Sequence, residues 1–122
     1  MLENHVTSLE LSKRLKELGV KQESLFYWVD KKGWALQDRK PIYCNIETCE
    51  CVEISYLSAF LASELGEVLG TQAQVWRHPK GWVAEHFLSG DKQFVENSMP
   101  DAIAKCLIYL AKKGIIKPNE IN

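Results

Sequence analysis

The sequence contains no long hydrophobic run. Its longest apolar stretch is "CLIYLA" at 106–111, well short of the ~18 residues that a membrane-spanning helix needs. The first residues, Met-Leu-Glu-Asn-His, lack the basic and apolar regions of a secretory signal. We therefore expect a cytoplasmic protein that does not contact a membrane. Thiols stay reduced in that compartment, so the four cysteines do not by themselves predict disulfides.

The familiar motifs of nucleotide, metal and acyl chemistry are also missing. The chain has no G-x-G-x-x-G or G-x-x-x-x-G-K-[ST] phosphate loop, no H-E-x-x-H zinc motif, no D-x-D-x-D-G calcium loop and no G-x-S-x-G nucleophile elbow. These absences exclude the motifs rather than every function that uses such groups. We accordingly expect no cofactor.

Positive charge is not concentrated in one part of the sequence. The formal net charge is −1, whereas a nucleic-acid-binding domain usually carries a basic excess on one surface. Single-stranded nucleic-acid binding on a sheet face is therefore the weakest of three functional hypotheses, because stacked bases would lack a basic groove for their phosphates. Much of the basic charge lies in three separate groups: Lys13, Arg14, Lys16 and Lys21; Lys31 and Lys32; and Lys112 and Lys113.

Three helices are predicted from caps and from the spacing of apolar residues, over 7–19, 58–70 and 98–114. Thr7 and Glu10 form a capping-box pattern at the start of the first helix. Ser58 and Ser98 are the predicted N-caps of the other two. The three apolar stripes are Leu11, Leu15 and Leu18; Phe60, Leu61, Leu65, Val68 and Leu69; and Ile103, Cys106, Leu107 and Leu110.

The strands are predicted to form hairpins. Residues 25–37 combine a run rich in aromatic and β-branched side chains with a turn that ends in Gly33. Residues 74–97 contain two further turns, "HPKG" and "SGDK", and so predict a three-stranded meander. Between 39 and 54 the only strand signal is "CVEI". The predicted fold is a single α+β domain, 1–122, with three helices on a mostly antiparallel sheet in the order α-β-β-α-β-β-β-α.

Four tryptophans lie beside the predicted turns: Trp28, Trp34, Trp76 and Trp82. One interpretation is structural, since indoles that face each other across two strands stabilise a hairpin. The other is functional, because Trp, Tyr and Arg dominate the energetically important residues of protein interfaces. On the functional interpretation one or two of the tryptophans lie in an exposed patch on an open sheet face, and Arg77, beside Trp76, would strengthen that patch. The candidate binding residues are Trp34, Trp76, Arg77 and Trp82.

Three of the four cysteines lie in "CNIETCEC" at 44–51. Cys49 and Cys51 would share one face of a strand with Cys44 nearby, so the three are the candidate ligands of a soft metal and the candidate partners of a regulatory disulfide. A structural zinc site needs four ligands, usually from two closely spaced pairs, and the sequence has no second pair. We interpret the three as small side chains that fill space. Cys106, on the third apolar stripe, is predicted to be a core residue.

No catalytic set is recognisable in the sequence. Alternation in "WVAEHFL" places Trp82, Ala84 and His86 on one face of a strand and Glu85 on the other, so Glu85 and His86 cannot act as one acid–base unit. None of the clustered cysteines begins a clear helix, where the pKa of a thiol would fall. We expect His86 to be a structural group with its hydrogen bonds satisfied, and the sequence favours a non-enzymatic protein.

Parts of the sequence resemble a known group of proteins. The segment "SLELSKRLKELGVKQESLFYWV" at 8–29 joins an "SK-L-ELG" helix to an "FYW" strand, and "ASELGEVL" and "DAIAKCLIYLAKKGII" resemble the later helices of that group. The group consists of small uncharacterised proteins encoded in phage and prophage genomes. The resemblance covers most of the chain, rests on structural residues and does not include the cysteine cluster. It implies a phage or prophage origin and a compact fold, and it assigns no activity and no functional residue.

The leading functional hypothesis is a small non-enzymatic domain of phage or prophage type that binds another protein. It combines the density of aromatic residues in the hairpins with the lack of a catalytic set. The alternative is a thiol- or metal-dependent protein centred on Cys44, Cys49 and Cys51. The oligomeric state and the partner are not predicted from the sequence.

Overall fold

The computed structural model describes residues 2–40, 42–45, 50–70, 72–90 and 92–118. Its helices are α1 (Leu9–Glu17), α2 (Ala62–Leu69) and α3 (Met99–Lys112), with short 3-10 turns η1 (Leu2–Asn4) and η2 (Phe87–Ser89). The strands are β1 (Phe26–Asp30), β2 (Trp34–Gln37), β3 (Ile42–Asn45), β4 (Glu50–Glu53), β5 (Tyr56–Ala59), β6 (Ala73–His78), β7 (Gly81–His86) and β8 (Phe94–Glu96). Every described strand pair is antiparallel, so the α+β class and the predicted element order are confirmed.

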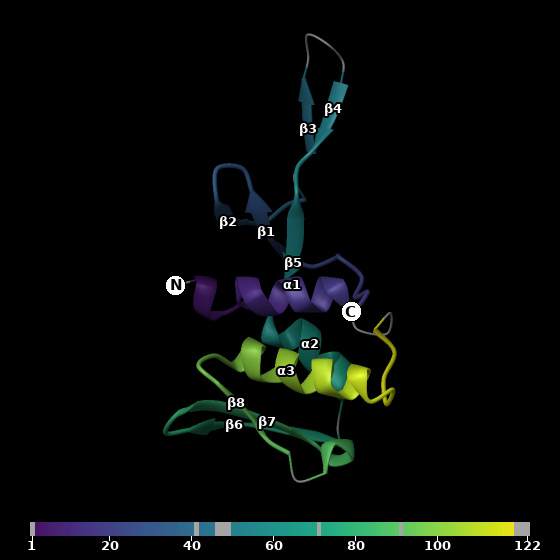
Figure 1. Cartoon of the computed structure of the whole chain (residues 1–122). Coiled ribbons are helices and arrows are strands. Elements are labelled where there is room, and N and C mark those ends of the chain that lie inside the picture. The colour runs from purple at the N-terminus through teal and green to yellow at the C-terminus, as the bar shows by residue number, and fades with distance from the viewer. Residues whose placement is uncertain (1, 41, 46–49, 71, 91, 119–122) are drawn as a thin grey trace.

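The helices lie between two small sheets (Figure 1). The β6–β7–β8 sheet packs against α3, which in turn contacts α2 and α1. On the other side of α1 lies the β2–β1–β5 sheet, which contacts that helix through β5. The β3–β4 hairpin forms a third, separate sheet and extends away from the other elements (Figure 1). The sequence did not predict this division of the strands among three sheets.

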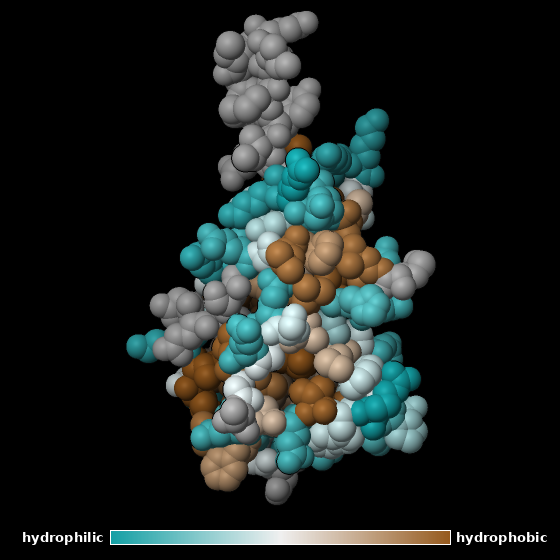
Figure 2. Space-filling view, turned by 180° about the vertical axis from the view of Figure 1, so that it is seen from behind, coloured by the Kyte–Doolittle hydropathy of each residue, from teal (hydrophilic) through white to brown (hydrophobic). Residues whose placement is uncertain are grey.

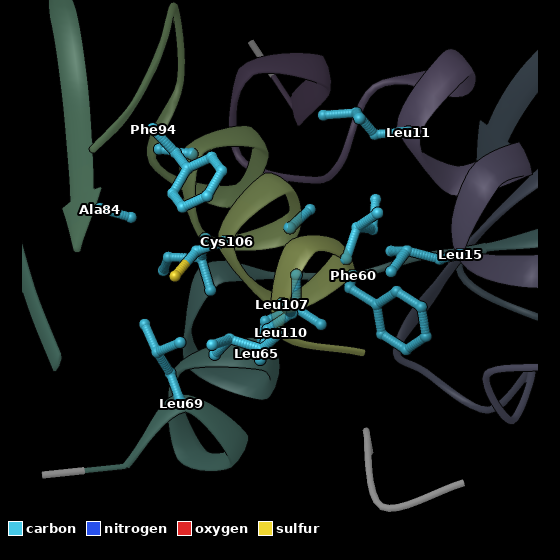
Figure 3. Close-up of a cluster of buried hydrophobic side chains, with 14 of the residues drawn as sticks. Leu11, Leu15, Phe60, Leu65, Leu69, Ala84, Phe94, Cys106, Leu107 and Leu110 are labelled. Atoms are coloured by element: carbon cyan, nitrogen blue, oxygen red, sulfur yellow. The ribbon is translucent and has the colours of Figure 1, made fainter. Parts of the chain in front are cut away.

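One apolar core joins the three helices to the β6–β7–β8 sheet. Figure 3 shows Leu15 and Phe60 next to each other, with Leu65, Cys106 and Leu107 continuing the cluster toward Ala84. The predicted stripe of α3 is confirmed, because all four of its residues are buried. No helix among the described residues is long and apolar enough to cross a membrane.

The first helix begins one residue later than predicted. Its N-cap is Ser8, whose hydroxyl accepts a hydrogen bond from the Leu11 amide at 3.4 Å. Thr7 is fully buried and its hydroxyl oxygen accepts instead from the Phe60 amide at 3.1 Å. The capping-box prediction at Thr7 was therefore wrong, because a contact with a distant segment takes the hydroxyl away from the helix.

The predicted N-cap Ser58 does not begin the second helix. It lies in β5, which pairs with β1 in the register Tyr27 to Ser58, and α2 starts only at Ala62. The hydrogen-bonding partner of β5 comes from a distant part of the chain, so local sequence signals could not reveal this strand. β1 is the central strand of its sheet, since it lies between β2 and β5.

Candidate functional site

The predicted binding residues do not form one patch. Trp34 lies on β2 in the β2–β1–β5 sheet, where the Lys13 ammonium is 5.5 Å from its ring centroid. Trp76 and Trp82 share the other sheet but face opposite sides of it, because Trp76 is paired with Val83 and Arg77 with Trp82. The structure therefore brings together only Arg77 and Trp82.

The structural interpretation of the tryptophans is also wrong in its details. Trp28 is paired with Leu36 and Trp34 with Asp30, so the two indoles of that hairpin do not face each other directly. The Trp28 Nε1–H donates to the Thr7 carbonyl at 2.9 Å and so ties β1 to the segment that precedes α1. All four tryptophans are half-buried, which leaves part of each indole exposed to a partner.

Arg77 and Trp82 line a groove of about 520 Å³ at the start of α3. The Arg77 guanidinium carbon lies 5.4 Å from the centroid of the Trp82 ring, a cation–π arrangement that holds the exposed arginine over the indole. We call this hollow the Arg77–Trp82 groove. Its lining residues are Asn4, His5, Ala62, Arg77, Trp82, Asn97, Ser98, Met99 and Pro100.

Local geometry explains why these residues meet. Trp82 is paired on its other side with Glu96 of β8, and the chain enters α3 directly after that strand, at Met99. The first turn of α3 must therefore lie beside the indole. Ser98 caps this turn as predicted, accepting from the Asp101 amide at 3.4 Å.

The groove combines an apolar floor with a polar rim. Trp82, Met99, Pro100 and Ala62 supply the apolar surface, and Arg77 is the one lining residue with a permanent charge. The nearby Asp101 carboxylate accepts a hydrogen bond from the Ser8 amide at 2.7 Å. Burial raises the pKa of Asp101 above its ordinary value, and this bond opposes the rise. Asp101 does not line the groove, so Arg77 determines the formal charge that the groove presents to a ligand.

His86 has a structural role, as predicted. It is 6% exposed, and its Nδ1 accepts from the Leu88 amide at 3.0 Å, which caps the turn η2. Glu85 faces the opposite side of the sheet and accepts from the Gln93 side-chain amide at 2.9 Å. The expected separation of this acid from this base is therefore confirmed.

The cysteine cluster is only partly within the described residues. The β3–β4 register places Cys44 directly opposite Cys51, and Cys49 lies outside the described residues. Among the residues whose placement is described, no group of three or more His, Cys, Asp or Glu could hold a metal ion. The metal and disulfide alternatives at positions 44, 49 and 51 stay predictions.

Thiol and metal analysis of the purified, reduced protein tests these alternatives. Burial raises the pKa of the Cys106 thiol to about 12, and its side chain is fully buried. We expect Cys106 to resist a thiol reagent at mildly alkaline pH until the protein unfolds. Bound metal whose removal makes Cys44, Cys49 and Cys51 reactive would establish the metal-dependent alternative.

Exposed apolar side chains also occur away from the groove. Val95 is 43% exposed and lies beside the buried Val83 and the half-buried Trp76, on the sheet face opposite Trp82. Phe87, which follows β7, is 77% exposed. Seen from behind, hydrophobic residues reach the surface both at the level of the β2–β1–β5 sheet and at the level of α2 and the β6–β7–β8 sheet (Figure 2).

Sequence reasoning missed most of the groove. His5, Ala62, Asn97 and Met99 come from segments far apart in the chain, and none of them belongs to a motif that signals binding. Only the pairing of the strands and the packing of α3 bring them to Trp82. Comparisons of the chain with protein-family models, with curated proteins and with solved structures gave no match.

Proposed function

We propose that this protein is a non-enzymatic module that binds a segment of a partner protein in the Arg77–Trp82 groove. The observation that carries the proposal is the position of Trp82, which packs against the core on one side and lines a 520 Å³ groove on the other. An anchored indole beside an arginine is the combination most enriched among the residues that dominate interface energies. The phage or prophage origin stays a prediction.

The lining of the groove indicates the chemistry of the segment. An apolar side chain would fill the space between the indole, Met99 and Pro100, and an acidic neighbour would pair with the Arg77 guanidinium. Because Trp82 is already held by the core and the Arg77 guanidinium already lies over its ring, little side-chain ordering is needed on binding. A short peptide with one apolar and one acidic residue close together fits these features.

Selection from a random peptide library on the immobilised protein tests this proposal without knowledge of the partner. We expect enriched peptides to carry an aliphatic or aromatic residue next to Asp or Glu. Arg77→Ala should weaken their binding about 10- to 30-fold, as expected for an arginine at the centre of an interface. Titration calorimetry with a synthetic copy of the enriched peptide measures the change.

Arg39→Ala is the matched control, because Arg39 is also exposed but lies after β2, away from the groove. Its affinity for the peptide should equal that of the unaltered protein. Trp82→Phe keeps an aromatic ring against the core and should weaken binding by less than Arg77→Ala. Failure to enrich any peptide, or equal binding by Arg77→Ala and Arg39→Ala, would contradict the proposal.

A further inference from the structure

A second groove, of about 320 Å³, lies toward the C-terminal half of α3 and is strongly basic. It is bounded by α1, α3 and the segment that leads into β8. Four of its seven lining residues are cationic and none is acidic, although the whole chain has a net charge of −1. We call it the basic groove, and its lining residues are Arg14, Lys92, Phe94, Lys105, Ile108, Tyr109 and Lys112.

Most of this charge is not neutralised within the described part of the chain. Lys105 forms an ion pair with Glu96, but Arg14, Lys92 and Lys112 form none with any described residue. Arg14 and Lys112 each lie in the last turn of a helix, where the negative end of the helix dipole offsets only a small part of their positive charge. Lys92 belongs to no helix. The groove therefore keeps a positive charge that an anionic ligand would stabilise.

Tyr109 lies at the centre of the basic groove. The Lys92 ammonium is 4.5 Å and the Lys113 ammonium 5.6 Å from its ring centroid, and the buried Phe94 ring is 5.5 Å away. These contacts hold the lysines near the ring rather than leaving them spread into solvent. With Ile108 they surround an apolar floor with positive charge.

We propose that the basic groove binds an acidic segment of another protein, whose carboxylates meet Arg14, Lys92 and Lys112. The proposal does not rest on the Arg77–Trp82 groove, which lies at the start of α3 and has a different lining. Complementary charge of this kind mainly increases the rate of association and the selectivity for the partner.

Two features favour an acidic peptide over a nucleic acid. Single-stranded nucleic acid needs a free aromatic surface for its bases, and Tyr109 already has two ammonium groups within 6 Å of its centroid. A groove of this size also spans too little surface to follow a row of phosphates.

Fluorescence anisotropy at low salt tests the proposal with a fluorescein-labelled peptide in which single leucines separate groups of glutamates. We expect the double variant Lys92→Glu, Lys112→Glu to weaken binding at least about tenfold, because two attractive contacts become repulsive. The control is Lys31→Glu, Lys32→Glu, which changes the net charge equally at an exposed turn between β1 and β2. Its affinity should fall by much less, because these two lysines do not line the groove, and the difference between the two double variants should grow as salt is raised toward about 0.15 M, where charges more than about 8 Å away are screened.

Three further measurements decide between occupants. The same peptide with glutamine in place of glutamate should not bind, and a single-stranded oligothymidylate should bind more weakly than the glutamate peptide. Arg77→Ala should leave binding of the glutamate peptide unchanged, which separates this groove from the Arg77–Trp82 groove. No binding at low salt, equal loss in both double variants, or tighter binding of the oligonucleotide would overturn the proposal.

Discussion

Phe60→Ala is expected to lower the free energy of unfolding by about 3–5 kcal/mol, the usual cost of removing a fully buried aromatic side chain. Phe60 has no exposed surface and is the largest of the fully buried side chains. Urea denaturation followed by circular dichroism measures the change. Phe87→Ala is the matched control, because that phenylalanine is 77% exposed and its loss should change stability by less than about 0.5 kcal/mol.

The position of Phe60 explains why the structure cannot easily close the resulting cavity. It follows β5 and precedes α2, and its backbone accepts from the Thr7 amide at 2.9 Å and donates to the Thr7 hydroxyl at 3.1 Å. Its ring lies beside Leu15 of α1 (Figure 3). These bonds hold the chain in place, so neighbouring side chains cannot collapse into the space that the ring leaves. Equal stability of Phe60→Ala and Phe87→Ala would contradict this account of the core.

Gly81→Ala is expected to cost roughly 2–4 kcal/mol, from backbone strain together with overpacking. Gly81 begins β7 with φ +135°, a conformation that residues with a side chain rarely adopt. A Cβ there would also overlap the backbone carbonyl oxygen of Glu96 and lie 3.4 Å from the Asn97 Cα. Because these atoms are backbone of the adjoining β8 segment, the overlap can be relieved only by moving the strand.

Gly33→Ala separates the backbone strain from the overpacking. Gly33 also has a positive φ, +116°, but a Cβ at that position would meet nothing within 4 Å. The variant should therefore show the strain alone, about 1–2 kcal/mol, and the difference between the two variants reports the contact with β8. Equal unfolding midpoints for Gly81→Ala and Gly33→Ala would show that β8 does not restrict this position. A displaced β8 would also move the first turn of α3 away from Trp82.

The two grooves lie along the same helix and have different chemistry. The Arg77–Trp82 groove meets the first turn of α3 and holds one permanent positive charge, whereas the basic groove begins at Lys105 and holds four. The acidic residues Glu10, Glu96 and Asp101 line a smaller hollow between them, together with Lys105. An acidic peptide would therefore be repelled from this hollow, and we expect the two grooves to bind their ligands separately.

Local sequence signals predicted elements whose physical causes are local. Helix caps, a stripe of apolar residues at helical spacing and a turn that contains glycine or proline each act over a few residues. For that reason the three helices, the β1–β2 hairpin and the β6–β7–β8 meander could be predicted before any contact was known. The burial of Cys106 and of His86 followed from the same periodicities.

Errors arose where a distant segment supplies the partner. Ser58 was predicted to cap a helix but lies in β5, because β1 offers that segment a hydrogen-bonding edge. Thr7 was predicted to cap α1 but bonds to the Phe60 backbone. Arg77 was predicted to extend a patch around Trp76, and the register of β6 and β7 places it beside Trp82 on the opposite face.

By itself, the sequence determined the class of the fold, the extent of α3 with its buried stripe, and the lack of familiar catalytic and phosphate-binding motifs. Only the tertiary structure decided which residues come together in the two grooves. It brings His5, Arg77 and Met99 around one indole, and it collects basic residues that are scattered along the chain into one groove. The physical reason is that a groove forms where separate elements pack together, and that packing depends on strand register and helix contacts between residues far apart in the sequence.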